Sequence, residues 1–101
     1  MNGDFFKKLD LSGCGFSEGS GVKIREAMGK AQLGGLEDLN LDRNPSWFYS
    51  KEKIDQWVQL FNTFDNLETL SLVGCIPEDV PECRFAIGSY KKFNRPGHVK
   101  L

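Results

Sequence analysis

Three glycines that follow a predicted strand are the residues whose spacing most nearly suggests a chemical site. Gly15, Gly19 and Gly21 give the pattern G-x-x-x-G-x-G ahead of a predicted helix. In a dinucleotide-binding β-α-β unit, glycines at this point let the backbone approach a pyrophosphate. The alternative is that they only form a flexible turn between a strand and a helix.

The cysteines and the single histidine are the other candidates for chemistry. Cys75, Cys83 and His98 do not have the close spacing of a zinc site. A nucleophilic Cys–His pair would need His98, which lies in a tail after Pro96 and Gly97. We therefore expect free thiols, an exposed tail histidine, no metal and no cofactor. The odd number of cysteines favours a reducing compartment.

Length and charge restrict the class of protein. A chain of 101 residues predicts a single domain, and a net charge of -1 gives no field that would attract nucleic acid. No apolar run approaches the roughly 18 residues that span a bilayer. The first residues show no basic region followed by an apolar stretch, so we expect no signal peptide. The expected location is intracellular, and cytoplasmic in particular.

Leucines alternate with polar residues in three short segments, which is the pattern of a half-buried strand. The pairs are Leu9/Leu11, Leu39/Leu41 and Leu70/Leu72. Their central leucines are 30 and then 31 residues apart. A fixed period of this length predicts stacked supersecondary units.

Between these strands the apolar period changes to that of a helix. Two stripes share the same spacing, Ile24, Ala27, Met28 and Ala31 in the first and Ile54, Trp57, Val58 and Phe61 in the second. Ser20 and Ser50 are placed as N-caps. We predict helices over about 20–31 and 50–63.

After the third strand the repeating pattern stops. Pro77 and Pro81 oppose a helix start, so residues 77–101 are predicted to be an irregular C-terminal cap and a basic tail, with 85–87 as a candidate short strand. In Trp47-Phe48-Tyr49, one or two rings are expected to pack under the second helix as core. The other interpretation of this aromatic run is an exposed anchor for a partner.

Residues 6–14, 36–44 and 67–75 each follow the pattern Leu-x-x-Leu-x-Leu-x-x-Asn/Cys, with Phe6 in place of the first leucine. This pattern resembles the leucine-rich repeat of the ribonuclease-inhibitor-like type. The resemblance implies an α/β fold, a short solenoid with parallel strands on the concave side and helices on the convex side. It also implies that Cys14, Asn44 and Cys75 point inward and bond to backbone groups. The expected organisation is one domain over 1–101, with repeats over about 5–34, 35–65 and 66–76.

Alternation along the predicted strands puts three rows of side chains on the concave face. The candidate partner-binding residues are Lys8, Asp38 and Thr69, then Asp10, Asn40 and Ser71, then Ser12, Asp42 and Val73, with Arg43 just beyond. These residues include no convergent acid–base pair. The prediction is therefore a protein that is not an enzyme, a noncatalytic protein–protein interaction module or a structural subunit of a larger complex. Phe5 and Phe6 are candidate edge contacts, because the first strand has no preceding repeat to cover it.

The alternative function is a dinucleotide-binding fragment of an enzyme that resembles the short-chain dehydrogenases, based on the glycine pattern. Two observations oppose it. The predicted strands alternate, whereas strands of a doubly wound parallel sheet are apolar on both faces. Tyr49 and Lys53 have the Tyr-x-x-x-Lys spacing of that family, but they lie on the wrong element and too early in the chain.

Overall fold

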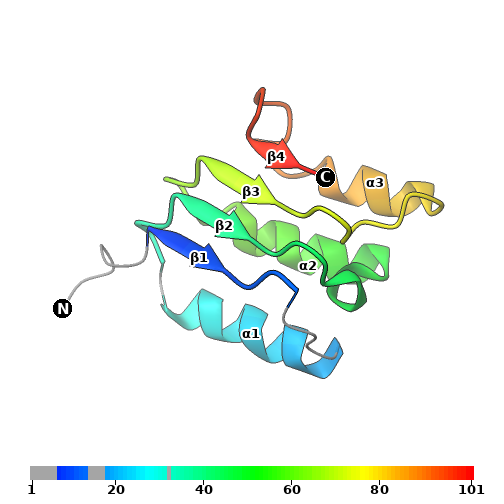
Figure 1. The fold of residues 1–101 in the computed structure, drawn as a ribbon, viewed down its shortest axis with the longest axis horizontal. Coiled ribbons are helices and arrows are strands. Elements are labelled where there is room, and N and C mark those ends of the chain that lie inside the picture. Colours follow the sequence, from blue (N-terminus) through cyan, green and yellow to red (C-terminus); the bar gives the residue numbers. More distant parts are fainter. Residues whose placement is uncertain (1–6, 14–17, 32) are drawn as a thin grey trace.

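The fold is seen in a computed structural model that describes residues 7–13, 18–31 and 33–101. Over these residues the chain forms a four-stranded sheet and three α-helices (Figure 1). The strands are β1 (Lys8–Asp10), β2 (Asp38–Asn40), β3 (Thr69–Ser71) and β4 (Val99–Lys100). The helices are α1 (Glu18–Ala31), α2 (Lys51–Phe61) and α3 (Pro81–Ile87), with a short 3₁₀ helix η2 (Pro45–Phe48) ahead of α2.

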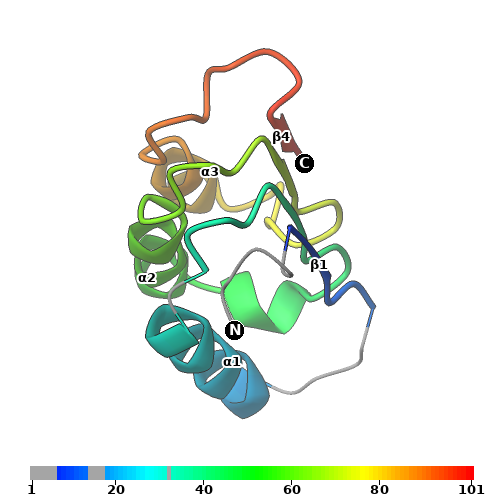
Figure 2. The ribbon, with the colours of Figure 1, turned by 90° about the vertical axis from the view of Figure 1, so that its left-hand side faces the viewer.

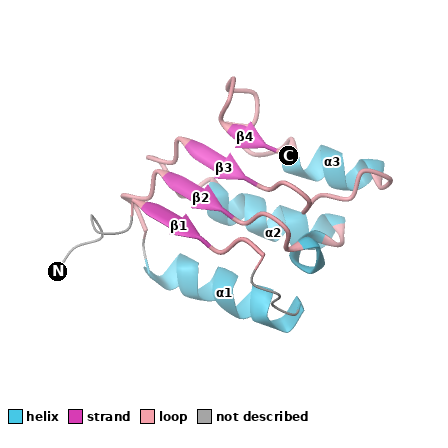
Figure 3. Ribbon diagram, viewed as in Figure 1, coloured by secondary structure: helices cyan, strands magenta, loops and turns pink. Residues whose placement is uncertain are grey.

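All four strands are parallel and lie in the order of the sequence, β1-β2-β3-β4. Leu9, Leu39 and Leu70 are in register, and Val99 of β4 continues the row. The helices cover one face of this sheet, as Figure 2 shows from the side, and Figure 3 distinguishes the strands and helices by colour. The predicted α/β class, the parallel sheet and the first three strands are therefore confirmed.

The core lies between the sheet and the helices. Leu39, Leu41, Leu70 and Leu72 are fully buried under the helix layer, with Ile54. Leucines at alternate positions of a strand share one face, and this is the face that the helices cover. Burial of such side chains removes apolar area from water and stabilises the layered arrangement.

The aromatic run before α2 divides between core and surface. Trp47 and Phe48 are buried, and the rings of Trp47 and Trp57 stack with their centroids 5.6 Å apart. Tyr49 is 72% exposed. The prediction that one or two of these rings pack as core is confirmed.

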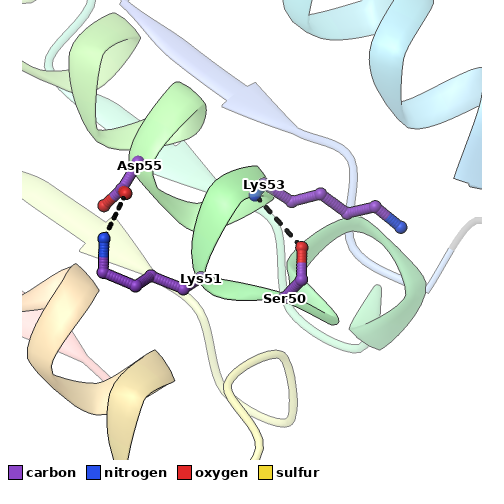
Figure 4. A network of polar contacts seen from close by, with 4 residues as sticks. All are labelled: Ser50, Lys51, Lys53 and Asp55. Atoms are coloured by element: carbon purple, nitrogen blue, oxygen red, sulfur yellow. Dashed lines mark hydrogen bonds and ion pairs between the residues drawn. The ribbon is translucent and has the colours of Figure 1, made fainter.

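Helix α2 follows the sequence prediction closely. Its predicted apolar stripe of Ile54, Trp57, Val58 and Phe61 is buried, and its N-cap is Ser50. The Ser50 hydroxyl accepts a hydrogen bond from the backbone N–H of Lys53 at 3.3 Å (Figure 4). Lys51 and Asp55, one helical turn apart, form a surface ion pair at 2.9 Å. The Ser50 hydroxyl thus accepts from one of the backbone N–H groups that have no carbonyl partner in the first turn of a helix.

The first helix differs from its prediction in two respects. It begins at Glu18, so Ser20 lies inside the helix and cannot be its N-cap. In the predicted stripe only Met28 is buried, Ile24 is half-buried, and Ala27 and Ala31 are exposed. Helix α1 lies at the end of the helix layer, and the other described helices lie on one side of it only (Figure 2).

The prediction of an irregular C-terminal cap is wrong. Residues 81–87 form α3, and its first residue is Pro81, where a missing N–H and a fixed φ are compatible with a helix. Residues 85–87 are the end of this helix and not a strand. Cys83, Ala86 and Ile87 are buried against the core. Val99 and Lys100 then supply the fourth strand beside β3.

The segment that joins α3 to β4 also packs against the body of the protein. The Lys92 ammonium donates to three backbone carbonyls, those of Asp65 at 2.7 Å, Leu67 at 3.2 Å and Phe64 at 3.3 Å. These carbonyls belong to the turn between α2 and β3. Lys92 therefore anchors this segment to the rest of the fold, whereas Lys91 and Arg95 are exposed.

Candidate partner-binding surface

The face of the sheet that the helices leave uncovered carries polar side chains, and we call it the helix-free face. The register aligns Lys8, Asp38 and Thr69 in one row, as the sequence predicted. Asp10, Asn40 and Ser71 form the next row, which Lys100 of β4 extends. Lys100 is not among the predicted residues of this face, because β4 has only two residues and shows no clear strand pattern in the sequence.

Short-range hydrogen bonds fix the polar groups at the end of β1 and β2. The Asp10 carboxylate accepts from the Ser12 hydroxyl at 2.6 Å and from the Ser12 N–H at 2.9 Å. These bonds, with the charge of Arg43, lower the pKa of Asp10 below 3.8. In β2 the Asn40 amide oxygen accepts from the N–H of Asp42 at 2.9 Å. The same turn thus recurs one repeat period later.

Asp42 joins β2 to β3. Its Oδ1 accepts from the Ser71 hydroxyl at 2.5 Å and from the Val73 N–H at 2.8 Å. Ser71 is only 7% exposed, so the expectation that its side chain is open to a partner is wrong. The Ser71 hydroxyl is bonded to Asp42, and strand β4 lies beside Ser71 in the sheet. Both residues have a structural use within the sheet.

Arg43 lies at the rim of the helix-free face in a left-handed backbone conformation, with φ of +60°. Gly13 and Gly74, at the equivalent positions of the neighbouring repeats, have φ of +57° and +76°. A Cβ on Gly13 would lie 3.1 Å from Nη2 of Arg43, so the guanidinium lies over the first turn. The exposed cation and the 43% exposed Val73 therefore border this face.

Below these turns two side chains point inward and bond to backbone carbonyls. Asn44 is 2% exposed, and its Nδ2 donates to Leu11 O at 2.9 Å, Leu41 O at 3.0 Å and Asp42 O at 3.3 Å. The Cys75 thiol donates to Leu41 O at 2.9 Å. Each side chain reaches back one repeat. Cys14, expected to have the same role, is outside the described residues.

The glycine pattern has a packing explanation at one of its three positions. Gly21 is buried in α1, and a Cβ there would lie 2.4 Å from Cδ1 of Trp47. Gly19 lies in α1 as well and is exposed, and Gly15 is outside the described residues. Of the two described glycines, Gly21 therefore lies within the predicted helix, and Gly19, expected in the turn before it, is helical as well.

The other candidates for chemistry are separate from one another. Cys75 and Cys83 are free and buried, and among the described residues no three His, Cys, Asp or Glu side chains are grouped to hold a metal ion. Burial raises the pKa of Cys75 to about 11. The expectation of an exposed His98 is wrong. It is 4% exposed, and its Nε2 is hydrogen-bonded to the Tyr90 hydroxyl at 2.8 Å.

The sequence signal for this buried pair was weak. Tyr90 and His98 stand among lysines, an arginine and a Pro-Gly pair, a composition that is typical of a solvated tail. Phe5 and Phe6, predicted as edge contacts, lie outside the described residues. In the described part of the chain, no helix has the length and apolar character needed to cross a lipid bilayer.

Comparisons of the chain with protein-family models, curated proteins and solved structures find no match.

Proposed function

We propose that this chain is a leucine-rich repeat solenoid of the ribonuclease-inhibitor-like type and that it serves as a noncatalytic protein–protein interaction module or as a structural subunit of a larger assembly. Three features with the same period support the repeat assignment. They are the leucine register, the left-handed turn at residues 13, 43 and 74, and the inward side chains of Asn44 and Cys75. Stacked units of this kind present one continuous strand face.

The observation that carries the binding function is the preorganised polar face. Lys8, Asp10, Asp38, Asn40 and Thr69 are exposed or half-buried there. The Asp10 and Asn40 side chains are already held by hydrogen bonds within the sheet. Groups that are fixed before binding lose less conformational entropy when a partner docks. The face therefore offers donors and acceptors of both charges at fixed positions, which suits recognition of a protein surface.

The size of the face determines how a partner would use it. Four strands at a spacing of about 4.8 Å give a width of only about 14 Å. A stable interface buries about 800 Å² on each partner, so a partner would also contact the rim at Arg43 and Val73. A charge change at the centre of such a small face should have a large effect on binding.

Substitutions on the helix-free face, with control substitutions on α2, test the proposed function. We expect the tagged chain to retain specific protein partners from cells that express it, and Asp38→Arg with Thr69→Arg to release them. The matched control is Gln56→Arg with Gln59→Arg, two exposed positions on α2. Loss of the same partners by both variants, or by neither, would contradict binding through the helix-free face.

A titration with NADH addresses the dinucleotide hypothesis directly. The proposed interaction module gives no saturable change of NADH fluorescence. A saturable change at micromolar NADH that Gly21→Ala abolishes would instead support the enzyme fragment and overturn the noncatalytic function.

A further inference from the structure

Strand β1 is the outer strand at one end of the described sheet, and half of its backbone groups point away from β2. Lys7 O and Leu11 N bond to β2, so in a strand the groups of the alternating residues Lys8 and Asp10 face outward. The equivalent residues of β3, Thr69 and Ser71, show how such backbone groups bond to a neighbouring strand. Thr69 N donates to Glu37 O at 3.0 Å, and Ser71 O accepts from Leu41 N at 2.9 Å. The outer edge of β1 thus repeats the edge that β3 offers to β2.

The apolar residues next to this edge are less covered than their equivalents in the next repeat. Leu9 and Leu11 are half-buried, whereas Leu39 and Leu41 are fully buried. In α1, Ile24 is half-buried, and Ala27 and Ala31 are exposed. Their equivalents in α2, Ile54, Trp57 and Phe61, are all buried. Equivalent positions of the repeat are therefore more exposed at the β1 end of the described structure.

The helix layer extends further than the sheet at this end. Figure 1 and Figure 2 both show α1 lying beyond β1, so that a shelf adjoins the edge of the sheet. We define the β1–α1 shelf by Lys8, Leu9, Asp10, Ile24, Ala27 and Ala31. A single added strand fits this shape, since its backbone would pair with β1 while its apolar side chains rest on α1.

Charge restricts which strand can be added. Lys8 is exposed beside the open edge, and a lysine there opposes pairing with a neutral or basic strand. An acidic residue directly opposite removes that penalty and adds a favourable cross-strand pair. The chain contains this combination already, because Asp38 of β2 lies opposite Lys8 on the inner side.

We propose that the β1–α1 shelf binds an extended strand of a partner polypeptide, with apolar side chains alternating toward α1 and an acidic residue opposite Lys8. This surface shares Lys8 and Asp10 with the helix-free face but adds the open backbone edge of β1 and the side of α1. If the shelf binds no strand, the proposed function of the helix-free face is unaffected, because different variants test the two proposals.

A synthetic peptide with the sequence of residues 36–44 is a suitable probe, capped at both ends. In the structure this segment presents Glu37 O and Leu41 N to β3. In the same register on the outer edge of β1, its Asp38 lies opposite Lys8 and its Leu39 opposite Leu9. The peptide thus has the required alternation and the required acid.

Titration of the isotope-labelled full chain with this peptide, followed by NMR, is the test. We expect shift changes at Lys8, Asp10, Ala27 and Ala31, and slower hydrogen exchange at the Lys8 and Asp10 amides. The Leu11 amide, which already donates to Asn40 O at 2.8 Å, is the internal reference. A peptide with Asp38→Lys should bind about 10-fold more weakly, and Lys8→Asp in the chain should restore its binding.

Two further variants of the chain test whether the peptide binds at the shelf or responds only to the overall charge of the protein. Ala27→Arg on α1 should weaken binding of the original peptide about 10-fold, because it removes an apolar contact at an exposed position. Lys100→Asp, at the opposite end of the sheet, should leave binding unchanged. The proposal is overturned if the peptide does not bind, if shift changes centre on Thr69 and Arg43 instead, or if the charge reversal in the peptide has no effect.

Discussion

The phenol of Tyr90 and the imidazole of His98 share a buried hydrogen bond, with 2.8 Å between Oη and Nε2. Their ring centroids are 5.6 Å apart. His98 directly precedes β4, and its own carbonyl accepts from Leu70 N at 2.8 Å. The pair therefore fixes the fourth strand to the sheet, and its protonation state affects the stability of the fold.

Stability should fall as the pH is lowered from 7 to 5. Burial lowers the pKa of His98 below 6.5, and the charges of Lys92 and Arg95 act in the same direction. The unfolded chain then binds more protons than the native chain between the two pKa values, so stability rises with pH across that window and is lost toward acid. Urea midpoints of the wild type and His98→Gln measure this effect. The difference between pH 7 and pH 5 should be smaller in the variant, and equal differences would contradict the assignment.

Two glycines of α1 should respond in opposite ways to alanine. At Gly21 the new Cβ would lie 2.4 Å from Trp47 Cδ1, so the ring must move, at a cost of about 1–3 kcal/mol. At Gly29 the nearest atom is the flexible Leu60 Cδ1 at 3.8 Å, so the gain in helix propensity of up to about 1 kcal/mol should remain. Thermal or urea unfolding of Gly21→Ala and Gly29→Ala checks the sign. Stabilisation by both would show that Trp47 does not contact α1.

Asn44→Leu should destabilise the protein by about 2–3 kcal/mol. The substitution keeps the branch at Cγ but removes the donor to the carbonyls of Leu11, Leu41 and Asp42. Net hydrogen bonds contribute about 1 kcal/mol each, and buried carbonyls without donors add a desolvation cost. Asn94→Leu, at an exposed position, is the control and should change the urea midpoint little. Similar effects of both substitutions would contradict the inward role of Asn44.

The Cys75 thiol should resist alkylation in the native protein. It is 1% exposed, its S–H donates to Leu41 O, and burial raises its pKa to about 11. Because the thiolate is the reactive form, little of it exists at pH 8. Iodoacetamide labelling followed by peptide mass mapping should find Cys75 unmodified in buffer and modified in urea. Rapid labelling in buffer would show that this turn opens readily.

The sequence predicted the elements that rest on local periodicity. Alternating leucines located β1, β2 and β3, and a stripe flanked by Ser50 located α2 within a few residues. For the candidate face, the rows of Lys8, Asp38 and Thr69 follow from the same alternation. Such patterns can be recognised in a sequence because the geometry of a strand or a helix fixes the direction of each side chain.

Features that depend on tertiary contacts could not be predicted in this way. From the sequence alone Pro81 opposes a helix start, whereas in the structure it is the first residue of α3, where proline is tolerated. Burial of His98 depends on Tyr90, and the two-residue strand β4 depends on the open edge of β3. The burial of Ser71 depends on Asp42 from the neighbouring strand, which no single-strand pattern reveals.

The strand order β1-β2-β3-β4 has a consequence for how the chain folds. Each strand pairs only with the strand before or after it in the sequence, so every strand pairing joins segments that are about one repeat apart. Topologies with short sequence separations between contacts fold faster than those with distant pairings. The described strands can therefore pair in the order in which they are synthesised, each on the edge left by the strand before it.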